Sequence, residues 1–149
     1  MISRILVPLD GSKAAQKAAH YAVEFAKQAG ATLTLLSVID KRFLVEQAVS
    51  ASASPTHVKE SVEDYLKQSA QSATDVIIKV CERNRVPCKA IIRTGHPVEE
   101  IVKEAVKSRA DLIIMGSHGK SALKAAILGS VAYGVMHKEA KTPVLIVRR

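Results

Sequence analysis

The sequence is poor in aromatic residues. It has no tryptophan, and phenylalanine and tyrosine together make up 3% of its 149 residues. Proteins that bind single-stranded nucleic acids stack the bases on aromatic side chains, so this scarcity argues against a nucleic-acid face despite a net charge of +8. The lysines and arginines are scattered along predicted helices, which is typical of a solvated surface. Such a surface remains compatible with anionic small molecules.

Cysteines and long apolar runs are also scarce. Cys81 and Cys88 have neither CxxC spacing nor a second pair or a nearby histidine, which argues against a zinc site or a CxxC redox motif. We therefore expect two reduced, partly buried thiols. No apolar run approaches the ~18 residues that span a bilayer, and the N-terminal segment before Asp10 lacks the features of a signal peptide. We expect a cytoplasmic protein without a membrane partner.

The remaining composition is that of a globular domain, with 48% apolar and 24% charged residues. We find no linker or internal repeat and expect one domain over residues 1–149. Short apolar runs alternate with segments of helical periodicity. Strands are predicted over 4–10, 31–40, 86–95, 110–116 and 142–149, helices over 12–30, 58–85, 96–109, 120–128 and 131–141, and a long loop over 41–57. Ser12 is the predicted N-cap of the first helix, and Gly30 is its predicted end.

This alternation predicts an α/β fold, an open five-stranded parallel sheet of the Rossmann-like kind. The strands are continuously apolar, so helices should cover both faces. If the strand order is 3-2-1-4-5, the first and fourth strands adjoin where the order reverses, and ligands bind beyond the carboxyl ends of strands at such a point. The segments at those two ends are 8–12 and 115–119.

The stretch GSHGKS at 116–121 ends like a phosphate-binding P-loop. The P-loop pattern needs a glycine five residues before Gly119, and that position is Ile114, so the interpretation is rejected. Ser130 is predicted to cap a new helix that starts near Val131, and a helix N-terminus preceded by glycines binds phosphate well. From the spacing alone, ordinary turn chemistry remains an alternative.

With these glycines, the chain resembles the universal stress proteins, specifically their ATP-binding branch. The branch carries G-x2-G-x9-G-[ST], matched here by Gly116, Gly119, Gly129 and Ser130. The segments ILVPLDGS, LLSVID, GHPVEEIVKEA, ADLIIMGSHGK, LGSVAYGVM and TPVLIVRR are also similar to the family, in the family's order. The resemblance implies the strand order 3-2-1-4-5 and a homodimer that pairs through the C-terminal edge strand 142–149.

The resemblance also implies a nucleotide site and the role of each residue in it. Asp10 would hydrogen-bond the ribose, Pro8, Leu9 and Val38 would line the adenine pocket, and Met115 would pack near the ribose or base. Gly116, His118, Gly119, Gly129, Ser130 and Val131 would surround the phosphates through the backbone. The ligand would be ATP, with AMP and ADP as further candidates, and Mg²⁺ or Mn²⁺ would be held mainly by the phosphates. No protein metal ligands and no catalytic residues are assigned.

Simpler interpretations stand beside these roles. Asp10 can cap the first helix together with Ser12, and the ring of His118 is expected to be solvated. Ser117 and Ser121 have no paired His and Asp, so nucleophilic catalysis is not predicted.

Three functions remain open. The first is a nucleotide-dependent switch or sensor in the stress response that acts on an unknown protein partner. The second is a slow ATPase, for which we find no obvious water-activating carboxylate or arginine finger. The third is a ligand-free dimeric interaction module, against which the intact glycine set argues.

Overall fold

The structure, a computed structural model, describes residues 1–42, 55–119, 127–139 and 141–148. The strands are β1 Arg4–Leu9, β2 Thr32–Asp40, β3 Cys88–Gly95, β4 Leu112–Gly116 and β5 Val144–Val147. The helices with described bounds are α1 Lys13–Ala29, α3 Pro55–Arg83, α4 Pro97–Lys107 and α5 Ser130–Lys138. The strands form one sheet of order β3-β2-β1-β4-β5 with parallel pairs throughout, which confirms the predicted fold class and strand order.

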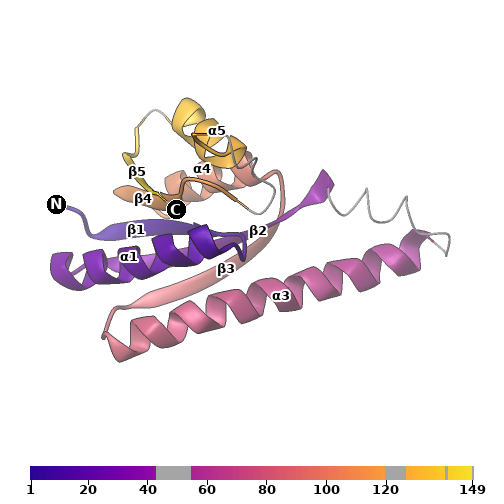
Figure 1. The fold of residues 1–149 in the computed structure, drawn as a ribbon, viewed down its shortest axis with the longest axis horizontal. Helices are drawn as coiled ribbons and strands as arrows, with labels where there is room; N and C mark the ends of the chain where they lie inside the picture. Colours follow the sequence, from indigo (N-terminus) through magenta and orange to yellow (C-terminus); the bar gives the residue numbers. More distant parts are fainter. Residues whose placement is uncertain (43–54, 120–126, 140, 149) are drawn as a thin grey trace.

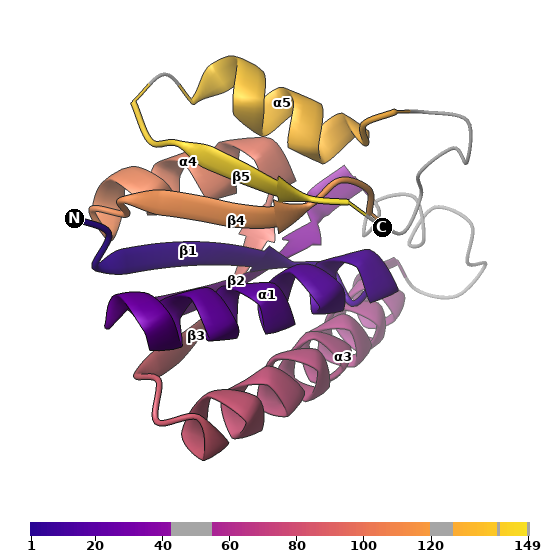
Figure 2. The same cartoon turned by 60° about the vertical axis from the view of Figure 1, so that its left-hand side comes forward.

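Helices cover both faces of this sheet. Helices α1 and α3 lie on one side, and α4 and α5 lie on the other (Figures 1 and 2). The core is divided in the same way. Ile5, Val7 and Leu9 of β1 pack with the alanines of α1 and with α3, whereas Leu6 packs with α4 and α5. The two-residue alternation of a strand explains this division, and the continuously apolar strands are therefore buried from both sides.

The ends of α1 follow from its own residues. Ser12 Oγ accepts a hydrogen bond from the Ala15 N–H at 3.1 Å and caps the N-terminus. Gly30 ends the helix in the left-handed conformation, with φ 69°. Both predictions for this helix are confirmed, because capping depends on residues within one turn.

Other predicted boundaries need correction. Helix α3 begins at Pro55, inside the predicted 41–57 loop, and residues 41–42 are already helical. Residues 43–54 lie outside the described residues, so the middle of that loop stays untested. Of the predicted helix 120–128, residues 120–126 lie outside the described residues, and 127–128 are not helical.

Strands β1 and β4 are neighbours in the sheet but pair only near their amino-terminal ends. We call the boundary between these two strands the β1–β4 seam. Strand β1 pairs with β2 from Arg4 to Leu9, but with β4 only at Ile5 and Leu6. The Arg4 carbonyl accepts from the Asp111 N–H and thus faces β4. Alternate residues of a strand face the same neighbour, so Pro8 also faces β4, and it has no N–H to donate. The ladder therefore stops before the carboxyl ends of these two strands.

Candidate functional site

The segments that follow β1 and β4 approach each other at the carboxyl edge of the sheet. A β-carbon placed on Gly119 would lie 2.6 Å from Asp10 Oδ2, so only glycine fits without displacing that carboxylate. Asp10 Oδ1 accepts from the Ser12 N–H at 2.9 Å, which fixes the turn into α1. We call residues 8–12, 38–40, 115–119 and 129–131 the carboxyl-edge site.

Gly129 is held against the loop that follows β4. Its N–H donates to the Ser117 carbonyl at 2.6 Å. A β-carbon on Gly129 would lie 3.0 Å from that carbonyl oxygen and 3.1 Å from the Cα of His118. These are backbone atoms that cannot move aside as the end of a side chain can. The close approach thus explains the last glycine of the motif, and it brings the start of α5 to the carboxyl-edge site.

The start of α5 differs from the prediction. Gly129, not Ser130, is the N-cap, and Ser130 is the first helical residue. The Gly129 carbonyl accepts from the Tyr133 N–H at 2.9 Å, and the N-cap glycine itself offers no side-chain cap. The prediction failed because the chain is pinned at Gly129, one residue before the predicted cap. The first turn of a helix leaves its N–H groups without intrahelical acceptors, and its positive dipole end favours anions.

His118 is buried, which corrects the expectation of a solvated ring. Its exposed fraction is 8%, and its Nδ1 lies 2.8 Å from Ser117 Oγ in a hydrogen bond whose donor depends on the imidazole tautomer. Ser117 is 3% exposed. Its N–H donates to the Val147 carbonyl at 3.0 Å, and its carbonyl accepts from Gly129. Sequence reasoning considered Ser117 only as a nucleophile and missed this organising role, since nothing local marks it.

The other predicted site residues separate into distinct environments. The Leu9 side chain is buried with α1 and α3, whereas Val38 and Met115 pack on the α4 and α5 face. Any ligand contact by Leu9 would therefore use its backbone. Gly116 lies against α1, because a β-carbon there would be 3.0 Å from the Ala14 carbonyl carbon and oxygen.

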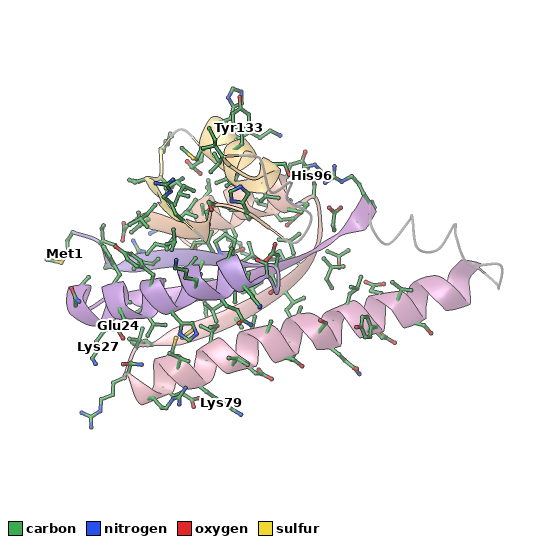
Figure 3. The ribbon with its side chains drawn as sticks, viewed as in Figure 1. Met1, Glu24, Lys27, Lys79, His96 and Tyr133 are labelled. Carbon is green, nitrogen blue, oxygen red and sulfur yellow. The ribbon has the colours of Figure 1, made fainter. Side chains whose placement is uncertain are left out.

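Two further residues lie at this edge. Asp40 ends β2, and its carboxylate accepts from the Arg42 N–H at 2.9 Å and from the Arg42 guanidinium at 3.1 and 3.2 Å. Burial raises the pKa of Asp40, but hydrogen bonds from Arg42 and the charges of Arg42 and His96 outweigh it and hold the pKa below its ordinary value. His96 is labelled at this edge in Figure 3, and its buried Nδ1 has no hydrogen-bond partner among the described residues. An acidic residue at the carboxyl end of a strand, comparable with Asp10 after β1, was the signal that could have found Asp40.

The described residues offer no group of three or more His, Cys, Asp and Glu side chains placed to hold a metal ion. In the same part of the chain, none of the helices has an apolar stretch that could cross a membrane.

Comparison with known proteins gives consistent matches along the chain. The model of the universal stress protein family matches residues 1–148. The universal stress protein MJ0577 of Methanocaldococcus jannaschii is 37% identical over 157 residues, covering 100% of this chain and 96% of that protein. Its solved structure has a TM-score of 0.85 and covers 100% of this chain and 97% of that one. The universal stress protein YxiE of Bacillus subtilis is 30% identical over 149 residues, covering 99% of this chain and 100% of that protein.

A more distant structure is that of a universal stress protein in complex with cAMP. It has a TM-score of 0.67 and 22% identity, and it covers 99% of this chain and 97% of that one. At this identity the likeness concerns the fold.

Proposed function

This chain belongs to the universal stress protein family, and we propose that it binds an adenine nucleotide, ATP before AMP or ADP, at the carboxyl-edge site. The observation that carries the proposal is the start of α5. Its N-cap is a glycine, which has no side chain to cap the helix, and this glycine is hydrogen-bonded to the loop that holds Gly119. Free N–H groups at a positive helix end match a phosphate chain.

The other parts of the nucleotide find complementary groups around this helix end. Asp10 Oδ2 lies beside Gly119, where a carboxylate can accept hydrogen bonds from ribose hydroxyls. Val38 and Met115 supply apolar surface from the ends of β2 and β4. Another protein of this fold forms a complex with cAMP, which makes adenine nucleotides the first ligand class to test.

Mg²⁺ or Mn²⁺ fits this site as a companion of the phosphates. Such ions keep several waters and bind through one or two carboxylates plus phosphate oxygens. Asp10 is assigned to the ribose, so phosphate oxygens and waters would supply most of the coordination. When bound, the cation would neutralise phosphate charge.

We further propose that occupancy acts as a switch. The loop after β4 and the start of α5 are joined in the protein by the hydrogen bond from the Gly129 N–H to the Ser117 carbonyl. A phosphate chain that contacts both Gly119 and the start of α5 would add a second connection between these two segments. Helix α5 packs on α4 and carries the exposed side chains of Tyr133 and Met136. Phosphate binding at its N-terminus would restrict the motion of α5 and of this exposed surface, to which a protein partner in the stress response could bind.

The homodimer is proposed to form through the outer edge of β5. The Pro143 and Val147 carbonyls accept from β4 and its following loop, so the backbone groups of Val144 and Ile146 face the other way. The residues of β5 are only half-buried. In Ile146→Pro the outward N–H is lost, whereas Ile146→Ala removes the side chain and keeps the N–H. We expect light scattering to show dimers for the wild type and Ile146→Ala and monomers for Ile146→Pro; equal masses for the two variants would contradict edge pairing.

The function is tested first by identifying what the purified protein carries. Denaturing the protein and analysing released nucleotides by mass spectrometry should give near-stoichiometric ATP, and calorimetry with Mg-ATP on stripped protein should show one site per chain. ADP or AMP alone, with turnover above background, would support the slow ATPase instead. No released nucleotide and no binding would support the ligand-free interaction module.

A further inference from the structure

Helices α1, α3 and α4 end in the same kind of turn at the amino-terminal edge of the sheet. In each turn one residue takes the left-handed conformation, and the next N–H donates at 2.9 Å to a carbonyl in the last turn of the helix. The left-handed residues are Gly30, Arg85 and Arg109, with φ 69°, 56° and 51°. Glycine adopts this conformation freely, whereas a β-carbon makes it costly. Two of the three turns therefore carry an arginine where glycine would fit better.

Nothing within the described residues explains these two arginines. The side chains of Arg85 and Arg109 are exposed, and neither forms a hydrogen bond or an ion pair with another residue that the structure describes. Cations in the last turn of a helix favour its negative dipole end, which accounts for Lys27, Arg83 and Lys107. The two left-handed arginines follow their helices, and α1 shows that the turn itself forms with glycine. Their guanidinium groups are available to a partner.

The turns that carry the arginines lie side by side along the edge of the sheet. The Asp111 N–H, before β4, donates to the Arg4 carbonyl of β1 at 2.8 Å, and Arg4 Nε donates to the Arg109 carbonyl at 3.0 Å. Strand β2 is hydrogen-bonded at 2.9 Å both to the segment before β1 and to the turn before β3. We call residues 1–4, 27–32, 82–88 and 107–112 the amino-edge surface. Neighbouring strands are ~4.8 Å apart, so this row spans about 14 Å.

The amino-edge surface is strongly basic. Its acidic residues are Glu82 and Asp111, and Asp111 Oδ2 already accepts hydrogen bonds from the backbone N–H groups of Ser3 and Arg4. Within the described part of the chain, none of its cations is ion-paired, whereas Arg93 elsewhere is paired with the buried Glu104. Cations that are scattered in the sequence thus gather in the fold, and Figure 3 labels one of them, Lys27. The exposed cations of this surface are Arg4, Lys27, Arg83, Arg85, Lys107 and Arg109.

We propose that the amino-edge surface binds the phosphate backbone of a nucleic-acid duplex, whatever its base sequence. A guanidinium group can donate two parallel hydrogen bonds to one phosphate. Arginines fixed on turns suit the rigid, regular phosphates of a duplex better than the fluid head groups of lipids. Binding to the backbone needs no stacking on bases, so the scarcity of aromatic residues does not oppose it. The surface itself contains no aromatic residue, which does not favour a protein partner.

This proposal goes beyond the nucleotide site and does not depend on it, because the two lie at opposite edges of the sheet. The test measures fluorescence anisotropy of labelled DNA and RNA duplexes of one mixed sequence, with the full chain, over a series of salt concentrations. The wild type is expected to bind at low salt, with affinity that falls steeply as salt rises. Comparing the two duplexes shows which sugar backbone is preferred.

The decisive variant carries both Arg85→Gly and Arg109→Gly. It removes two guanidinium groups and relieves two left-handed side chains, so its urea midpoint should equal or exceed that of the wild type. Its duplex affinity at low salt should fall ~10-fold, and the slope of log K against log salt should become shallower by about 2. Mg-ATP binding, measured by calorimetry, should not change.

The matched control carries Lys17→Gln and Lys67→Gln, which remove the same charge from exposed positions of α1 and α3 outside the amino-edge surface. It should keep the salt slope of the wild type. Equal losses in the two double variants would assign binding to net charge and overturn the proposal. So would a wild type that binds neither duplex, or one that binds phosphatidylserine vesicles more tightly than both. A lower urea midpoint with unchanged duplex affinity would make the arginines structural and also overturn it.

Discussion

The two ends of the β1–β4 seam are built in opposite ways. At the amino-terminal end, Asp111 Oδ2 accepts hydrogen bonds from the Ser3 N–H, the Ser3 Oγ–H and the Arg4 N–H at 2.9 to 3.1 Å. The strands pair there and close the sheet. At the carboxyl-terminal end, the ladder has stopped, Pro8 has no N–H to donate, and the loops approach closely at Gly119 and Gly129.

The amino-terminal end satisfies its backbone groups with Asp111, whereas the carboxyl-terminal end is the place where we propose that a ligand binds. The same contrast separates the two helices that start at the carboxyl edge. Helix α1 is capped by the side chain of Ser12, whereas the N-cap of α5 is Gly129, which has no side chain. Groups that the protein itself satisfies contribute to stability, and helix N–H groups that it leaves uncapped are suited to binding.

The largest effect on nucleotide affinity is expected from adding a side chain at Gly119, in the carboxyl-edge site. Gly119→Val puts a branched side chain where phosphate is proposed to lie and pushes against Asp10 Oδ2, 2.6 Å from the new β-carbon. Losing two charge-assisted hydrogen bonds lowers affinity at least ~100-fold, so calorimetry should show Mg-ATP binding lost, while the urea midpoint stays near that of the wild type. Unchanged affinity would remove Gly119 from the site.

A double-mutant cycle sharpens this result. Gly119→Ala and Asp10→Ala are made singly and together, with Glu24→Ala on the exposed far half of α1 as the charge control. If the new methyl group acts only by displacing Asp10, the double variant should bind Mg-ATP like Asp10→Ala. Additive losses would mean that the methyl group itself occupies the phosphate space.

A smaller effect is expected at the capped helix. Ser12→Ala removes the acceptor for the Ala15 N–H and should cost about 1 kcal/mol of unfolding free energy. Nucleotide affinity should hardly change, because this end of α1 is satisfied by its own residue. Urea unfolding measures the cost, and Ser72→Ala on the exposed face of α3 is the matched control. A parallel loss of affinity would show that α1 also takes part in binding.

The smallest effect, a change in stability, is expected at Asp111, at the amino-terminal end of the β1–β4 seam. Hydrogen bonds from the backbone N–H groups of Ser3 and Arg4 hold the pKa of Asp111 below its ordinary value. A carboxyl whose folded pKa is lowered stabilises the fold above its unfolded pKa, about 3.9, and that contribution is lost as pH falls through the folded pKa. Asp111→Asn should therefore unfold at lower urea than the wild type at pH 7, and the gap should narrow below about pH 4.

Asp64→Asn makes the same charge change at an exposed position of α3 and serves as the control for this comparison. If the difference in urea midpoint between Asp111→Asn and the wild type stays constant with pH, the effect comes from the shape of the side chain and not from its charge.

Much of the fold was predictable because its determinants are local. The apolar runs set the strands, and the two-residue alternation divided their side chains between two cores. Ser12 and Gly30 set the ends of α1 within one turn. The motif glycines marked the loops of the candidate site, but their spacing could not say what each one touches.

The details of the site depend on segments distant in sequence. Ser130 fits an N-cap by residue type, yet the Gly129 hydrogen bond to Ser117 makes Gly129 the cap. His118 follows a strand like a solvated loop residue, yet it is buried. Neither outcome could be read from neighbours in the chain.

The alternation of strands and helices, the two-sided burial of the sheet and the capping of α1 follow from the sequence alone, because hydrophobic periodicity and capping act over a few residues. The close approach of Asp10 to Gly119 and the hydrogen bond that holds Gly129 against Ser117 came from the folded chain alone. Contacts of this kind depend on which strands adjoin and where a ladder stops, and those are properties of the packed sheet.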